Sequence, residues 1–204
     1  MIESALRLGL TLGLAHASDA DHVCTIAALL RSERGVRDAL RTSLVWGLGH
    51  SATFLAGGAL VVAADVRLPG WLAPAAELLV ALSLVWLGVR QWRHAACAVS
   101  EAPHEHRGLR TFSLGLVHGL AGSAGLGLVA LTTMSGRAEA LLFLGLYGVS
   151  VVLGMALVTL ALSLPLGAMA QRSLAWRTAV LRVAAFASFS AGLWFLARLV
   201  VSPT

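Results

Sequence analysis

Residues 14–23, which read LAHASDADHV, hold two histidines and two aspartates between apolar stretches. Imidazole and carboxylate groups together supply the nitrogen and oxygen ligands that suit divalent first-row transition metals. On a continuous helix, which turns about 100° per residue, the spacing of three places His16, Asp19 and His22 on one face. Asp21 would point away from this face, where it could line another side of the site or orient a neighbouring side chain. The pattern predicts a metal site, with a structural hydrogen-bond network as the alternative.

Two further histidines, His50 in WGLGHSATF and His118 in LGLVHGLAG, stand near the middle of apolar segments. Polar positions at similar depth on different helices favour one common site, to which His50 would bring a ligand and His118 a contribution from the second half of the chain. A lone histidine inside a membrane can instead make a hydrogen bond between helices. This alternative has more weight for His118 than for His50.

A polar loop at residues 94–109 contains the pair His104 and His106 beside glutamates. A His-x-His pair next to carboxylates can capture metal ions transiently. An ordinary solvated loop explains the same residues equally well.

The elements that carry these residues are strongly apolar. Hydrophobic residues make up 58% of the 204 and charged residues 12%, and the mean hydropathy is +0.82. A soluble domain carries about a quarter charged residues, so the composition indicates an all-α integral membrane protein whose partner is the lipid bilayer. The net charge of +5 does not indicate nucleic-acid binding, because the arginines fall in short loops as topology signals do.

A membrane-spanning helix needs about 20 mostly apolar residues, and six segments of the chain meet this requirement. They are roughly 5–30, 40–64, 74–93, 110–133, 138–163 and 176–200. We expect one transmembrane domain over residues 1–204, with both termini outside the inner (plasma) membrane. The three loops that we place in the cytoplasm carry eleven of the fifteen arginines.

The two halves of the chain, 5–93 and 110–200, resemble each other weakly. The corresponding pairs are His16 with His118, GHSATF at 49–54 with GVSVVL at 148–153, and WLGVR at 86–90 with WFLAR at 194–198. Because each half has an odd number of spans, the halves would be inverted in the membrane. Inverted repeats are a common plan of transporters, which place their site near the midplane.

Three motifs resemble those of the nickel/cobalt transporter (NicO/NiCoT) family and its short six-span members. HASDADHV at 16–23 resembles the family's H-A-x-D-A-D-H signature, GLGHSATF at 47–54 its second motif, and residues 115–129 are similar to the short members. The resemblance implies metal recognition by His16, Asp19, Asp21, His22 and His50. The acidic motif that longer members carry in their second half is absent here.

These observations lead us to expect a transporter of a divalent metal ion, Ni²⁺ or Co²⁺, that works by alternating access at a midplane His/Asp site. The ion would be the substrate, and we expect no enzymatic activity and no permanent cofactor. The sequence leaves import or export, the energy source and homo-oligomer formation open.

Two other functions stay open at this point. One is export of another small solute, although an anion site would be expected to offer arginine or helix N-termini rather than carboxylates. The other is a membrane thiol–disulfide electron carrier, which needs paired reactive cysteines. The two cysteines, Cys24 and Cys97, form no CxxC motif.

Overall fold

A computed structural model describes residues 2–30, 35–64, 70–94, 107–119, 127, 130–131, 133–170 and 174–201. Seven labelled helices account for most of these residues, which confirms the predicted all-α class. They are α1 (Ile2–Ala17), α2 (Ala20–Leu30), α3 (Val36–Ala64), α4 (Leu72–His94), α5 (Arg107–His118), α7 (Arg137–Ala170) and α8 (Leu174–Val201).

Among the described residues, four helical segments are long and apolar enough to cross a membrane. They are Val36–Ala64, Pro74–Arg93, Arg137–Leu164 and Thr178–Val201. These correspond to the predicted spans 40–64, 74–93, 138–163 and 176–200. Large apolar side chains on their outer faces are exposed, among them Leu60, Leu157 and Val183, as expected where lipid is the solvent.

The first predicted span, 5–30, is not one helix. The amide nitrogens of Ser18 and Asp19 bond carbonyl oxygens three residues back, at 3.0 and 3.1 Å, and α1 ends there. The amide nitrogen of Val23 then bonds the carbonyl oxygen of Asp19 at 3.0 Å, which starts α2 with Asp19 as its N-cap. Aspartate favours this position because its side chain competes with the backbone for hydrogen bonds. The expectation of a continuous helix through the His/Asp stretch was therefore wrong.

The break divides the span into pieces of 16 and 11 residues. At about 1.5 Å per residue, neither piece alone reaches across a hydrocarbon core of about 30 Å. The polar residues at the junction therefore lie between two half-length helices.

The fourth predicted span, 110–133, is described only in part. Helix α5 ends at His118, and beyond it the described residues Gly127, Ala130 and Leu131 are helical. The loop with His104 and His106 lies outside the described residues, and so does Cys97.

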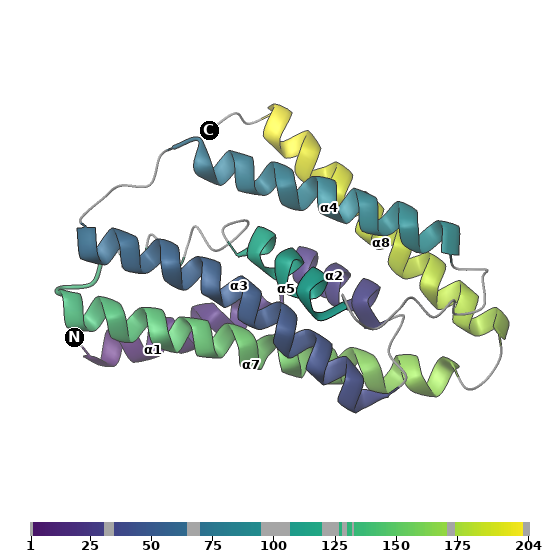
Figure 1. Cartoon of the computed structure of the whole chain (residues 1–204), viewed down its shortest axis with the longest axis horizontal. Helices are drawn as coiled ribbons and strands as arrows, with labels where there is room; N and C mark the ends of the chain where they lie inside the picture. The colour runs from purple at the N-terminus through teal and green to yellow at the C-terminus, as the bar shows by residue number, and fades with distance from the viewer. Residues whose placement is uncertain are drawn as a thin grey trace.

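The helices form two outer layers with short helices between them (Figure 1). In one layer α3 and α1 pack against α7, and in the other α4 pairs with α8. Helices α2 and α5 lie between the layers, where α2 contacts α4 and α8 and α5 contacts α3. Helix α1 begins at one end of the long axis, whereas α8 ends near the middle of that axis.

Glycines let these helices approach one another backbone to backbone. A Cβ atom built on Gly115 of α5 would collide with the carbonyl oxygen of Trp46 and lie 2.9 Å from the amide nitrogen of His50. A Cβ atom on Gly13 of α1 would lie 2.7 Å from the carbonyl oxygen of Tyr147 on α7. The same contacts that join the helices thus set the position of the His50 backbone.

Candidate metal centre

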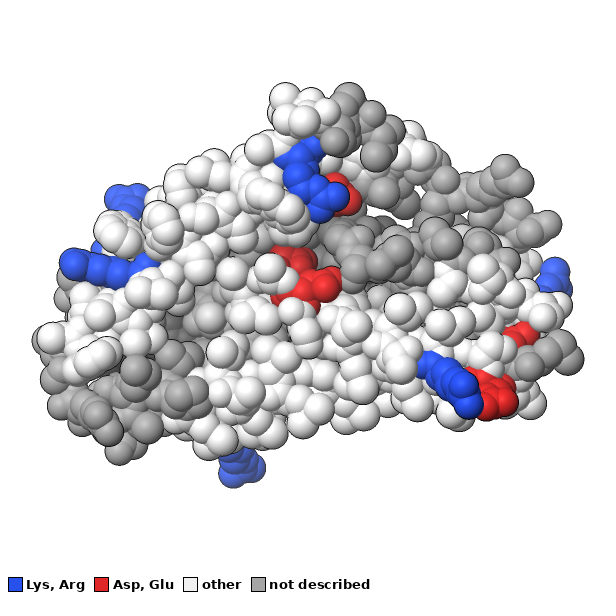
Figure 2. All heavy atoms as spheres, turned by 180° about the vertical axis from the view of Figure 1, so that it is seen from behind, with Lys and Arg blue, Asp and Glu red and all other residues white. Residues whose placement is uncertain are grey.

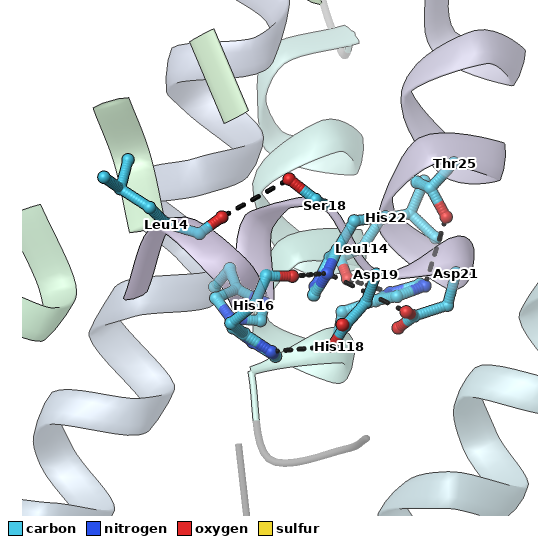
Figure 3. Close-up of polar contacts among 10 residues, drawn as sticks. Leu14, His16, Ser18, Asp19, Asp21, His22, Thr25, Leu114 and His118 are labelled. Atoms are coloured by element: carbon cyan, nitrogen blue, oxygen red, sulfur yellow. Dashed lines mark hydrogen bonds and ion pairs between the residues drawn. The ribbon is translucent and has the colours of Figure 1, made fainter. Parts of the chain in front are cut away.

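The break between α1 and α2 brings three histidines together inside the protein. His16 lies in the last turn of α1, His22 in the first turn of α2, and His50 comes from α3; all three are buried. One ring nitrogen from each lies within 4.8 Å of those of the other two. Figure 3 shows the polar side chains gathered around the break.

His16 is held at both ring nitrogens. Its Nδ1 lies 3.0 Å from Oδ2 of Asp19, and its Nε2 lies 2.9 Å from Nε2 of His50. A carboxylate that accepts a hydrogen bond from Nδ1–H leaves a lone pair on Nε2, the arrangement usual for metal-binding histidine. Asp19 therefore orients His16 towards His50.

The distance between His16 and His50 fits a shared ion as well as a hydrogen bond. Metal–imidazole bonds are about 2.0–2.1 Å long, so two such nitrogens at a right angle about the metal lie roughly 2.9 Å apart. The 2.9 Å between the two Nε2 atoms equals that separation. Because Nε2 of His16 holds a lone pair, Nε2 of His50 is the donor in this contact, and its proton would have to move to Nδ1 of His50 before both Nε2 atoms could bind one ion.

His22 has one nitrogen engaged and one free. Its Nδ1 donates to the backbone carbonyl oxygen of His16 at 2.8 Å, the same oxygen that accepts from the amide nitrogen of Asp19. Nε2 must then carry the lone pair, and this buried atom has no hydrogen-bond partner among the described residues. The tautomer of His22 thus presents a ligand atom to the cluster.

The two carboxylates differ in exposure. The Asp19 side chain is 32% exposed and the Asp21 side chain 2%. Asp21 Oδ1 lies 3.8 Å from Nδ1 of His22, and its buried Oδ2 has no hydrogen-bond partner in the part of the chain that the structure describes. Asp19, Asp21 and His22 form a second close group of ligand atoms. Both acids stand at the N-terminus of α2, whose partial positive charge favours them.

Figure 2 shows where charge lies on one face of the molecule. One group of acidic atoms stands near the middle of this face, and other acidic groups lie beside basic side chains towards its edges. With its partly exposed carboxylate, Asp19 gives the buried histidines a polar connection to the surface.

His118 lies beside the cluster but is bonded to protein atoms at both nitrogens. Nδ1 donates to the carbonyl oxygen of Leu114 at 2.9 Å, and Nε2 accepts from the hydroxyl of Thr25 at 3.3 Å. Its ring centroid is 6.4 Å from that of His22. The contribution of His118 to metal binding stays a prediction.

Sequence reasoning missed the aromatic side chains around the histidines. Trp46 lies 5.3 Å from His22 and Tyr147 lies 5.8 Å from His16, measured between ring centroids. Tyr147 is the single tyrosine of the chain, and its place in a long apolar segment was a signal that could have been followed. Cys24 is half-buried and forms no disulfide with a described residue.

Comparison with known proteins places the chain in a family. The family model described as HupE / UreJ protein matches residues 2–198. The chain belongs to the HupE/UreJ family. With its four apolar helices of spanning length, this HupE/UreJ member is a multi-pass membrane protein.

One relative is similar over nearly its whole length. It is the urease accessory protein UreH of Bacillus sp. (strain TB-90), 26% identical over 218 aligned positions that cover 98% of this chain and 93% of the relative. No solved structure matches this HupE/UreJ protein. The narrower resemblance to nickel/cobalt transporters stays a prediction.

Proposed function

We propose that this protein carries a divalent transition-metal ion, Ni²⁺ or Co²⁺, across the inner membrane. The observation that carries the proposal is the convergence of buried ring nitrogens from His16, His22 and His50 on one place. His16 Nε2 and His22 Nε2 would bind as lone-pair donors, since the Nδ1 atoms are occupied by Asp19 and a backbone carbonyl.

The donor set selects the class of ion. Imidazole nitrogen suits Ni²⁺ and Co²⁺, whereas Mg²⁺ and Ca²⁺ prefer shells of oxygen. The carboxylates of Asp19 and Asp21 would offset the cation's loss of hydration, because uncompensated charge inside the membrane is costly. They would also repel anions, which weighs against export of an anionic solute.

The relative is named a urease accessory protein. We extend this to the present chain as an accessory role, in which the transported ion is supplied to a metal-dependent enzyme rather than used by the transporter itself. On this proposal the protein has no catalytic residues of its own.

We further propose that the chain folds as two inverted three-span halves that rock against each other. Supporting this, close backbone approaches occur in exchanged pairs. A Cβ on Gly9 of α1 would lie 3.4 Å from the amide nitrogen of Tyr147 on α7, and a Cβ on Gly115 of α5 would lie 2.9 Å from that of His50 on α3. The α1–α7 contact thus has a counterpart in the α5–α3 contact.

The layer formed by α4 and α8 shows the same kind of reciprocal backbone contact within one helix pair. A Cβ on Gly88 of α4 would lie 2.7 Å from the amide nitrogen of Phe189, and one on Gly192 of α8 would lie 2.8 Å from that of Val85. Exchanging α4 and α8 exchanges these contacts. Such packing suits a rocking motion about a fixed central site.

This register differs from the correspondences seen in the sequence. The sequence comparison aligns 49–54 with 148–153 and so pairs His50 with Val149, whereas the packing pairs His50 with Tyr147. An alignment of two segments rich in leucine and glycine can shift by one or two residues and still match. A backbone contact fixes which residues are paired.

For topology, we propose six crossings with both termini outside. The arginine distribution supports this. Reporter fusions at Thr204 should be active outside the cytoplasm, and a fusion at residue 100 inside it. A cytoplasmic C-terminus would contradict the proposed topology.

Metal accumulation tests the transport proposal. Cells that express the protein should differ from empty-vector cells in their content of ⁶³Ni and ⁵⁷Co, with a higher content for an importer and a lower content for an exporter. Cells that express His50→Ala at equal membrane levels should match the empty vector. Unchanged metal content, together with no Ni²⁺ or Co²⁺ binding by the purified protein, would overturn the proposal and favour another solute.

A further inference from the structure

Tyr147 stands against the metal centre from the second half of the chain. Its side chain is 1% exposed. Its ring stacks on that of His16, with ring centroids 5.8 Å apart and an angle of 29° between the planes. It also stacks on the ring of Phe54, with centroids 4.2 Å apart and an angle of 28°. Offset stacking at these separations is a favourable arrangement of two rings.

The backbone of Tyr147 is fixed to the same helix that carries His16. The carbonyl oxygen of Tyr147 would lie 2.7 Å from a Cβ on Gly13, one turn before His16 in α1. Ring and backbone of Tyr147 thus both contact the last turns of α1. A shift of α7 relative to α1 would change the position of the Tyr147 ring relative to His16.

His16 is therefore bounded on two sides by positions that the exchanged packing makes equivalent. His50 of α3 contacts it with ring centroids 4.9 Å apart, and Tyr147 of α7 contacts it at 5.8 Å. The first of these positions holds a nitrogen ligand and the second holds a phenol ring. Asp19 contacts Nδ1 of His16, and the His22 ring lies edge-on to the His16 ring, with centroids 4.5 Å apart.

We propose that Tyr147 is a positioning residue of the metal centre, whose ring holds the His16 imidazole with its Nε2 directed at His50. This inference rests on the proposed function. The ring restricts the imidazole to one plane, while Asp19 restricts rotation within it. Because Tyr147 belongs to α7, its contact also links the packing of the two halves to the affinity for the ion.

Three variants of the full-length protein in detergent test the proposal. Tyr147→Phe keeps the ring, Tyr147→Leu removes it, and Phe143→Leu removes a fully buried ring that lies 5.8 Å from Tyr147. Phe143 has no ring contact with the described histidines that the structure records. It is therefore the matched control for loss of a core aromatic residue.

The measurements are Co²⁺ affinity by calorimetry and the visible spectrum of bound Co²⁺, which reports coordination geometry. Tyr147→Phe should match the wild type in both. Tyr147→Leu should bind Co²⁺ about 10- to 100-fold more weakly, the usual cost of losing a group that orients a metal ligand, with an altered spectrum. Phe143→Leu should lower the unfolding temperature and leave the spectrum unchanged.

Two results would overturn the positioning role. One is a wild-type affinity and spectrum in Tyr147→Leu. The other is an equal defect in Tyr147→Phe, which would assign the effect to the hydroxyl. Absence of both Co²⁺ and Ni²⁺ binding in the wild type would instead contradict the proposed function itself, so the two failures are distinguishable.

Discussion

The crossing of α1 with α7 and the crossing of α5 with α3 have similar backbones and different chemistry. Glycines at both crossings bring main chain against main chain. At the first, α1 ends in His16, whose Nε2 faces another histidine. At the second, α5 ends in His118, whose Nε2 accepts a hydrogen bond from Thr25. Close helix packing and ligand placement can therefore vary separately.

The difference follows from what happens after each histidine. Just after His16, helix α1 ends and a new helix starts at Asp19. This brings the His22 ring close to those of His16 and His50. Around His118, the protein supplies partners for both ring nitrogens. On the proposed function, metal binding would fall to the first half and a supporting role to the second.

The largest effect expected from this comparison is loss of binding in His50→Ala. Removing one of three converging nitrogens should abolish Ni²⁺ binding measured by calorimetry on the purified protein. His118→Ala should keep binding within about tenfold, below the usual cost of losing an orienting group. Equal loss in both variants would place His118 among the ligands and remove the difference between the halves.

The next effect concerns packing. Gly9→Val and Gly115→Val should each lower the free energy of unfolding by about 1–3 kcal/mol or more, because the new side chains meet backbone atoms. Thermal unfolding in detergent measures this. Gly145→Ala, where a Cβ meets nothing within 4 Å, is the control and should be neutral. Destabilisation at only one of the two crossings would contradict their equivalence.

Asp19→Asn sharpens the role of the carboxylate in the first half. Asparagine is as good an N-cap as aspartate, so α2 should still begin at the same residue. Loss of the charge beside His16 Nδ1 should weaken Co²⁺ binding about 10- to 100-fold. Asp38→Asn, at an exposed acid in the first turn of α3, controls for a general charge effect. Full affinity in Asp19→Asn would remove Asp19 from the centre.

The smallest effect is expected in the loop outside the described residues. The double variant His104→Ala/His106→Ala should raise the half-saturating metal concentration only a few-fold and leave the maximal rate of transport unchanged, because a solvated loop can collect ions but cannot replace the buried site. Initial rates at several Ni²⁺ concentrations measure both. An inactive variant at normal membrane levels would make the loop an essential part of the path.

Several features could be read directly from residue types. Apolar stretches of spanning length predicted the helical class, and four of the predicted spans agree with apolar helices of the structure to within about four residues. These predictions succeed because the bilayer imposes length and hydropathy on each segment by itself. The unusual cost of His and Asp inside such segments likewise marked residues 16–22 and His50 as candidates.

The arrangement of those candidates was not available from helical periodicity. Placing these residues on one helix face assumed that residues 5–30 form one uninterrupted helix, whereas helix α1 ends at Ala17. His16 and His22 meet because the break allows His22 Nδ1 to donate to the His16 carbonyl oxygen. Helical periodicity identified the residues, but the interruption of the helix brought His16 and His22 together.

By itself, the sequence determined that the chain is helical and lies in a membrane, and which polar residues stand in its apolar segments, because hydropathy and side-chain chemistry are properties of single residues and short runs. Only the tertiary structure decided that His50 reaches His16, that His118 is bonded elsewhere, and that Tyr147 lies on the His16 ring. Those contacts join positions 34 or more residues apart. They depend on which helices pack together and in what register. Both are set by backbone contacts at glycines, and the short sequence around a glycine does not predict which helix it contacts.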